Sequence, residues 1–327
     1  MKLIELLDQE AARLEQSGVF FGHGTLNAFD EAAWLLLWRL GLPLDDLDGV
    51  ADCPLDVGQV QAVQALVERR ISTRQPAAYL TGEAWLQGLP FHVDARTIVP
   101  RSLIAEVLAD GMLEAWMPGA PQRVLDLCTG NGSLAVLAAM AYPDVSVDAA
   151  DLSDDALAVA RINVDQHGLQ GRITLLQSDG LSSVNGPYDL ILCNPPYIAQ
   201  DDPHLPALRF EPSMALSAGP SGLDDLAHLA HHSGARLNAG GCLLLEHGYD
   251  QGAAVRGLEL LAERFSRIKD GSEKDAIAME LLGRTGVQMI PLFNDGAHAI
   301  GALNALPIRP ARFWAIITAS SFRSGLP

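Results

Sequence analysis

The chain has 327 residues, and at roughly 150 residues per domain this length predicts about two domains. Hydrophobic residues make up 49% of the chain and charged residues 19%, which excludes an intrinsically disordered chain and a fibrous repeat. The formal net charge of −18 disfavours a phosphate backbone as the partner and favours a basic protein.

The amino terminus and the cysteines bear on where the protein works. Residues 1–16 interleave acidic and apolar side chains, so they lack the uninterrupted apolar stretch of a secretory signal. The apolar stretch 289–308 contains polar residues and two prolines, which disfavours a membrane span. Four cysteines, from Cys53 to Cys242, stand far apart and show no paired metal-ligand spacing. We therefore expect a cytoplasmic protein with reduced cysteines and no membrane partner.

Residues 1–75 carry apolar side chains at helical spacing. Leu3, Leu6 and Leu7 form the first such run, and similar runs surround Trp34 and Val63. Apolar stripes on short helices need partners to cover them. We therefore predict a small helical bundle as an amino-terminal domain.

Residues 76–100 change to a strand-like pattern. Two apolar runs, residues 79–86 and 89–93, flank Gln87 and Gly88, as two short strands joined by a tight turn would. This pattern predicts a β-hairpin linker between two domains.

Strand-like and helix-like segments alternate in residues 101–327, the predicted second domain. The predicted strands are residues 123–127, 145–150, 173–177, 188–193 and 242–246. The predicted helices lie around 134–138, from a cap at 151–155 through Ile162, and over 223–237. This alternation predicts a mostly parallel α/β sheet with helices on both faces and ligands at the carboxyl ends of its strands. Residues 312–318 are a candidate closing strand, and from about residue 268 the rest of the tail is unassigned.

A glycine-rich motif, residues 124–132, follows the first strand of this sheet. Glycines at such a turn allow a ligand to approach the backbone, and the next helix points its amide groups at that ligand. Asp151 comes 21 residues after Gly130, where a carboxylate can accept hydrogen bonds from ribose hydroxyls. The motif also satisfies a relaxed dinucleotide fingerprint, which keeps an NAD oxidoreductase as an alternative. Asp126, inside the strand, favours S-adenosylmethionine, whose ammonium and sulfonium charges suit a carboxylate.

Further candidate cofactor contacts lie beside these residues. Asp179, after the third strand, can accept a hydrogen bond from an adenine amino group, or it is a plain surface acid. The full candidate cofactor-binding set is Asp126, Cys128, Thr129, Gly130, Gly132, Asp151, Leu152, Asp179 and Asn194.

A second motif, Asn194-Pro-Pro-Tyr197, directly follows the strand 188–193. Its prolines stiffen the backbone and lack N–H groups, so the Asn194 side chain and the Pro195 carbonyl are both available as acceptors. Two acceptors can hold both N–H groups of an amide or amine and orient its lone pair toward a methyl donor. Tyr197 can stack on a planar target or face a sulfonium cation.

Three histidines, His228, His231 and His232, lie within one predicted helix. Neither a Cys nor an acidic ligand completes a zinc set at a diagnostic spacing, so we interpret them as a solvated helix face.

The motifs DLCTGNG and NPPY, with Phe210-Glu-Pro212, resemble the N(5)-glutamine methyltransferases of the HemK/Prm family. Residues 21–32 and 99–102 resemble the PrmB branch, which acts on the third protein of the large ribosomal subunit. The segments 197–204, 221–225 and 245–248 resemble at least as much the PrmC branch, which acts on peptide chain release factors.

The resemblance implies a class I, Rossmann-like methyltransferase sheet with a small N-terminal helical domain that recognises the protein partner. It implies that Asp126, Gly130, Gly132 and Asp151 hold S-adenosylmethionine, and that Asn194, Pro195 and Tyr197 hold the glutamine amide. Arg101 is expected near the cleft or in a linker role, and Glu211 is expected to pair with a basic residue and fix a lid. His23 and Asn27 shape the partner surface, or they are core and helix-cap residues.

We favour glutamine methylation of the large-subunit ribosomal protein because residues 21–32 lie in the domain expected to choose the partner. Release factors are the alternative substrate. A DNA adenine methyltransferase also uses an Asn-Pro-Pro-Tyr turn, but the acidic charge disfavours it. A non-catalytic ribosome-assembly factor is a further alternative, and an NAD oxidoreductase is disfavoured still more. The chain departs from release-factor enzymes at Gly180, where they often carry an aromatic residue beside the adenine.

Overall fold

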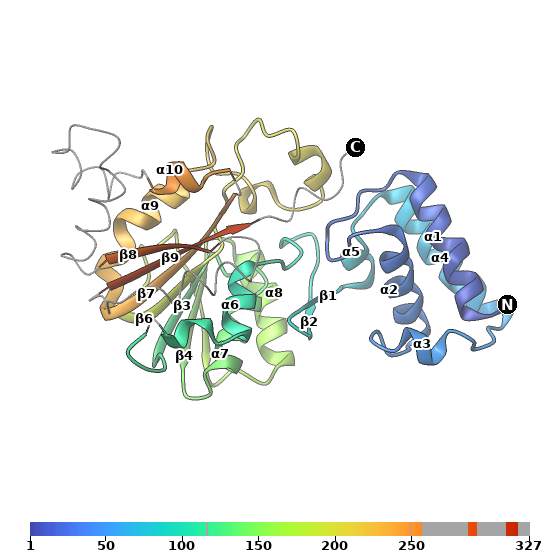
Figure 1. The fold of residues 1–327 in the computed structure, drawn as a ribbon, viewed down its shortest axis with the longest axis horizontal. Coiled ribbons are helices and arrows are strands. Elements are labelled where there is room, and N and C mark those ends of the chain that lie inside the picture. Colours follow the sequence, from blue (N-terminus) through green and yellow to red (C-terminus); the bar gives the residue numbers. More distant parts are fainter. Residues whose placement is uncertain (116, 249, 257–286, 293–311, 320–327) are drawn as a thin grey trace.

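A computed structural model describes residues 1–115, 117–248 and 250–256, and the strands 287–292 and 312–319. A helical unit lies to one side of a sheet-containing unit, and a two-stranded hairpin lies between them (Figure 1). In the described part of the chain, no helix combines the length and the apolarity that crossing a membrane requires.

Helices fill the amino-terminal unit, as its apolar spacing predicts. They are α1 (Leu3–Ser17), α2 (Ala28–Leu40), α3 (Leu47–Val50), α4 (Val57–Thr73) and α5 (Ala77–Thr81). Leu3, Leu6 and Leu7 are fully buried against α2 and α4, in a core that also contains Leu35 and Val63. The helix prediction for this region is confirmed, while the division at residues 75 and 100 stays a prediction.

The hairpin is shorter than its sequence pattern predicts. Its strands are β1 (Glu83–Leu86) and β2 (Leu89–His92), which pair antiparallel around Gln87 and Gly88. Residues 79–81, predicted as strand, belong instead to helix α5. Pro76 is the N-cap of that helix, and Gly82, in the left-handed region at φ 71°, is its C-cap.

The second unit is built on a seven-stranded sheet in the order β5-β4-β3-β6-β7-β9-β8, with every neighbouring pair parallel. The strands are β3 (Arg123–Leu127), β4 (Ser146–Asp151), β5 (Ile173–Gln177), β6 (Tyr188–Cys193), β7 (Leu237–Gly248), β8 (Val287–Leu292) and β9 (Arg312–Ala319). The predicted parallel α/β sheet is therefore confirmed, and β9 confirms the closing strand. The rest of the unassigned tail, apart from β8, lies outside the described residues.

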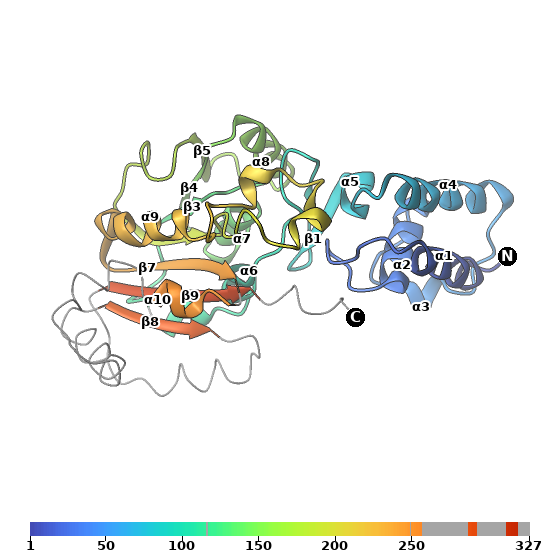
Figure 2. The ribbon, with the colours of Figure 1, turned by 90° about the horizontal axis from the view of Figure 1, so that it is seen from above.

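Helices pack on both faces of this sheet (Figure 2). They are α6 (Leu103–Ala109), α7 (Ser133–Ala141), α8 (Asp154–Gln166), α9 (Asp224–His232) and α10 (Gly252–Arg256). Successive residues of β6 alternate between two cores, because Leu190 and Leu192 pack with α6 and α7 while Ile191 and Cys193 pack with α9. This double burial explains the continuous apolar run of the strand.

Two helix boundaries differ from the prediction. Helix α8 continues to Gln166, beyond the expected end at Ile162. The helix predicted over 223–237 ends at His232, and a 3-10 turn over Ser233–Arg236 leads into β7. Strand β7 then begins five residues before the expected start at Cys242, because Leu237 already pairs with Tyr188 of β6.

Candidate active site

A cavity of about 420 Å³ lies at the carboxyl ends of four neighbouring strands. One wall consists of residues that directly follow β3, β4, β5 and β6. These are Cys128, Gly130, Asp151, Leu152, Ser153, Ser178, Asp179, Gly180, Asn194 and Pro196. The position agrees with the general rule for ligands of open parallel sheets. Four segments far apart in the sequence thus meet at one site.

The turn after β3 has a strongly constrained backbone. Cys128 and Gly130 both have positive φ, at 59° and 56°, and both line the cavity. Gly132 has a different role, because a Cβ on it would come 3.1 Å from the Cβ of Ala160 in α8. Its lack of a side chain allows α7 and α8 to pack closely. The structure thus shows a packing reason for Gly132, while the expectation that both glycines hold the cofactor stays a prediction.

Asp126 lies behind this turn and not in the cavity wall. Its side chain is fully buried, and Oδ2 accepts hydrogen bonds from the Thr129 hydroxyl and from the Ala135 amide at 2.9 Å. Burial raises the pKa of Asp126 to about 7. Thr129 is also buried, and its amide donates to the Ala150 carbonyl. Both residues therefore fix the turn to the start of α7, and neither lines the cavity.

Asp151, at the end of β4, connects the turn after β3 with the cavity wall. Its Oδ2 accepts from the Gly130 amide and its Oδ1 from the Ser153 amide, both at 2.9 Å. Burial raises its pKa, although these amide bonds act in the opposite direction. A carboxylate oxygen has more than one lone pair, so Asp151 can accept further hydrogen bonds from a ligand in the cavity. Asp179 is exposed at the same wall, beside Gly180.

Asn194, in the turn after β6, lines the cavity, and one hydrogen bond orients its side chain. Asn194 Nδ2 donates to the Arg101 carbonyl at 3.2 Å, which leaves Oδ1 as the acceptor. Pro196 also lines the cavity, while Pro195 is buried. Tyr197 packs against the core beneath α9, and its carbonyl accepts from the Gln251 side chain at 2.8 Å. Of the residues expected to hold the target amide, Asn194 is the one that lines the cavity.

An ion pair joins the segment before α6 to the segment after the proline turn. Arg101 donates to both carboxylate oxygens of Glu211, at 2.7 and 2.6 Å, and Glu211 also accepts from the Val99 amide. The Glu211 side chain is fully buried. Burial alone would raise its pKa, but the Arg101 guanidinium outweighs burial and lowers it. The predicted partner of Glu211 is therefore Arg101, whose carbonyl also orients Asn194.

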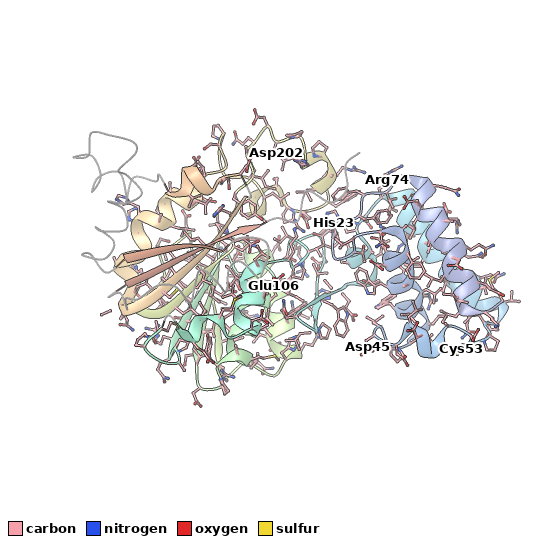
Figure 3. The ribbon with its side chains drawn as sticks, in the orientation of Figure 1. His23, Asp45, Cys53, Arg74, Glu106 and Asp202 are labelled. Atoms are coloured by element: carbon pink, nitrogen blue, oxygen red, sulfur yellow. The ribbon has the colours of Figure 1, made fainter. Side chains whose placement is uncertain are left out.

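The amino-terminal candidates have separate roles. Asn27 is the N-cap of α2, since its side chain accepts from the Asp30 amide at 2.9 Å. His23 is 4% exposed and lies where the helical unit meets the sheet unit (Figure 3). Burial, with smaller contributions from Arg101 and Arg70, lowers the pKa of His23 to about 4. The cap interpretation of Asn27 is thus confirmed.

Sequence reasoning missed much of the opposite cavity wall. The lining there comes from Arg96, Thr97, Ile98, Pro212, Met214, Ala215, Asp224, Asp225, His228 and Leu229. His228 is exposed, as predicted for a solvated helix face, yet its ring lies 3.6 Å from the position a Cβ on Gly180 would take. Among the described residues, no group of three or more His, Cys, Asp or Glu side chains is placed to hold a metal ion. Pro212, Asp224 and Asp225 lie in segments that carry the family resemblance, although sequence reasoning assigned them no role at the site. The other residues of this wall show no motif, because long-range folding brings them to the cavity.

Comparisons with known proteins match both units. The family model described as the methyltransferase small domain matches residues 105–209, and the PrmC N-terminal domain matches residues 5–82. The chain is 45% identical over 272 residues to the ribosomal protein uL3 glutamine methyltransferase of Burkholderia pseudomallei, covering 79% of this chain and 88% of that protein. Identity to the protein of the same name from Bordetella pertussis is 46% over 256 residues, with coverage of 76% and 85%. For the Neisseria meningitidis serogroup B protein it is 43% over 251 residues, with coverage of 76% and 82%.

Proposed function

The chain belongs to the family of ribosomal protein glutamine methyltransferases, and on that premise we propose that it methylates a glutamine side-chain amide of ribosomal protein uL3. This is the third protein of the large ribosomal subunit, and we place the enzyme with it in the cytoplasm. The single observation that carries the proposal is the cavity at the ends of β3 to β6, which Asn194 lines with its Nδ2 bound to the Arg101 carbonyl.

The residues of the cavity fit S-adenosylmethionine, which supplies an electrophilic methyl group on a sulfonium. Asp151 offers free lone pairs at the end of β4, suited to ribose hydroxyls, and Asp179 offers an acceptor for an adenine amino group. Carboxylates also suit the positive charges of this donor. Asp126 contributes indirectly, since it holds the turn that carries Gly130.

The turn after β6 would orient the target amide. An amide nitrogen is a weak nucleophile because its lone pair is delocalised. Asn194 Oδ1 and the Pro195 carbonyl would accept its two N–H groups and direct the lone pair into the cavity. Holding reacting groups in this way can contribute roughly 7 to 11 kcal/mol in favourable intramolecular reactions.

Proton transfer requires no dedicated base in this scheme. The nitrogen that gains a methyl group gives up one proton, and solvent can accept it after the transfer. Glu211 is committed to Arg101 through two hydrogen bonds, which suits a residue that positions the turn. The chemistry would therefore depend on geometry more than on acid–base catalysis.

Radiolabelled methyl transfer to purified uL3, release factor and DNA tests the proposal. We expect label in uL3 that mass spectrometry localises to one glutamine with a single methyl increment. Label in release factor alone would select the second candidate, which the match of residues 5–82 to the PrmC N-terminal domain favours. Label in DNA, or in none of the three, would contradict both.

A further inference from the structure

A second cavity, of about 350 Å³, lies between the helical unit and the hairpin. We call it the anchor groove. Its apolar lining comes from α2, from the segment that leads into α3, and from β1, and includes Phe29, Trp34, Leu44, Leu47 and Trp85. Large side chains from three elements thus surround one depression.

Solvent reaches the aromatic rim of the anchor groove. Trp85 is 45% exposed and Phe29 is 42% exposed, although both are large and apolar. Exposed aromatic side chains beside a concave surface are typical of sites that receive another protein chain.

The anchor groove also contains polar atoms that lack a partner. His23 Nε2 and Trp34 Nε1 are buried without a hydrogen-bond partner in the described part of the chain, and both residues line the groove. His23 is 4% exposed. Buried polar atoms are nearly always satisfied in folded proteins, so these two are polar groups beside the groove to which a local shift of the side chains would let a bound peptide add hydrogen bonds.

The charge around the anchor groove is acidic. Asp30 lines the groove, where burial keeps His23 neutral at pH 7, and the segment that contributes Leu44 and Leu47 also carries the exposed acids Asp45 and Asp48. Figure 3 shows Asp45 at the lower edge of the helical unit. A basic segment would complement these carboxylates, and proteins that bind the RNA backbone are rich in Lys and Arg.

The anchor groove and the active-site cavity share one stretch of chain. Thr97 and Ile98 line the active-site cavity, and the next two residues, Val99 and Pro100, line the anchor groove. Arg101 follows, and its carbonyl holds Asn194. A chain bound in the groove would therefore lie next to the residues that orient the target amide.

We propose that the anchor groove binds a basic, extended segment of the protein substrate and receives one apolar side chain from it. The proposal rests on the proposed function, because it takes a ribosomal protein as that substrate. Binding there would set the protein substrate's affinity without changing the methyl-transfer step.

Substitution of Phe29 and Trp85, the two exposed aromatic residues at the rim, tests whether the groove receives an apolar side chain. The double variant Phe29→Ala, Trp85→Ala in the full-length enzyme should raise KM for unmethylated uL3 about 30-fold, the scale of a hot-spot pair, and leave kcat and S-adenosylmethionine affinity unchanged. The matched control Val57→Ala, Met140→Ala removes exposed apolar side chains outside the groove and should match wild type. An unchanged KM in the rim variant would overturn the proposal.

Charge reversal tests whether the acidic residues beside the groove attract a basic segment of the substrate. Asp45→Lys, Asp48→Lys should weaken uL3 binding about 10-fold at low salt and less at high salt, as screened charges require. The control Asp8→Lys, Glu15→Lys reverses two exposed acids on α1 and should have a smaller effect. Equal effects of the two variants would show that overall charge, and not the groove, attracts the substrate.

Calorimetric titration of uL3 separates this proposal from the proposed function, because binding needs no turnover. Wild-type binding that the rim variant weakens would support the groove even where no methyl is transferred, and the proposed function alone would then fail. If methyl transfer occurs and the rim variant binds uL3 as tightly as the wild type does, the proposal for the groove alone would be overturned. Absence of wild-type binding would overturn both.

Discussion

The two turns that present residues to the active-site cavity are held in place by different means. The turn after β3 is fixed by carboxylates of β3 and β4 themselves, with Asp126 bound to Ala135 and Asp151 bound to Gly130. The turn after β6 is fixed from a distance. Asn194 is held by the carbonyl of Arg101, and the Tyr197 carbonyl by the side chain of Gln251.

Under the proposed function, the turn after β3 serves cofactor binding and the turn after β6 serves orientation of the target amide, so the two tasks are supported by different parts of the chain. The cofactor side is held by neighbouring strands and should keep its shape when remote parts of the chain change. In the proposed arrangement, the amide side depends on the Arg101–Glu211 pair, which joins the segment before α6 to the segment after the proline turn. Damage to that pair should therefore impair methyl transfer more than cofactor binding.

Arg101→Met should have the largest effect. It leaves Glu211 buried without its cation, and breaking one side of a buried pair costs roughly 3 to 5 kcal/mol of unfolding free energy. Urea denaturation measures the loss. Lys2→Met, which breaks the exposed pair with Asp52, is the control and should cost about 0 to 1 kcal/mol. Similar losses in the two variants would show that the buried pair stabilises the fold no more than an exposed pair does.

Asn194→Ala should lower the methylation rate by at least about 100-fold, or roughly 2.7 kcal/mol, the scale of one lost preorganised hydrogen bond. Affinity for S-adenosylmethionine should remain nearly intact, because the cofactor side is held by other residues. Single-turnover kinetics and calorimetry measure the two quantities. Asn185→Ala, in an exposed loop, is the control. A near-normal rate would remove Asn194 from the mechanism.

The contrast between local support of one turn and remote support of the other also explains how much of the site the sequence predicts. Asp151, Gly130 and Asn194 stand in short motifs directly after strands, so their place at the cavity follows from local pattern and parallel topology. The carbonyl of Arg101 carries no sequence signal, because every residue has one and its neighbour Asn194 is 93 residues away. Met214 and His228 reach the cavity through long-range packing that no spacing encodes.

The sequence predicts the fold to a similar extent: local patterns are predictable, and long-range packing is not. Periodicity predicts most helices and strands, since each stripe or run has to be buried. It fails at residues 79–81, where Pro76 and Gly82 enclose a short helix inside an apolar run that reads as strand. The close approach of Ala160 to Gly132 has no sequence signal either, because only the packing of α8 brings the two residues together.

Asp151→Ala should weaken S-adenosylmethionine binding by roughly 1.5 to 3 kcal/mol, the scale of a hydrogen bond to a charged group. Asp151→Asn retains an acceptor oxygen and should lose less. Asp154→Ala removes an exposed acid from the first turn of α8 and is the control. Calorimetric titration measures the affinities. Wild-type affinity in Asp151→Ala would contradict the assignment of this carboxylate to the ribose.

Substitution of His23 should give the smallest effect. It tests, through the pH dependence of the unfolding free energy, the junction near Arg101 and Glu211, which supports the turn after β6. Its pKa falls from 6.5 to about 4 in the folded chain, chiefly because it is buried, with Glu211, Arg101 and Arg70 as its charged neighbours. Below pH 6.5 the unfolded chain therefore binds a proton that the folded chain does not, so the free energy of unfolding decreases as the pH falls toward 4. Between pH 7 and pH 5 the loss of unfolding free energy from this group should be about 1 to 2 kcal/mol.

Urea denaturation at several pH values measures this loss. The free energy of unfolding of His23→Gln should fall less between pH 7 and pH 5 than that of the wild type, whereas the exposed-site control His231→Gln should follow wild type. Parallel curves for all three proteins would show that protonation of His23 is not coupled to unfolding, and that the junction beside Arg101 and Glu211 opens easily enough to admit a proton.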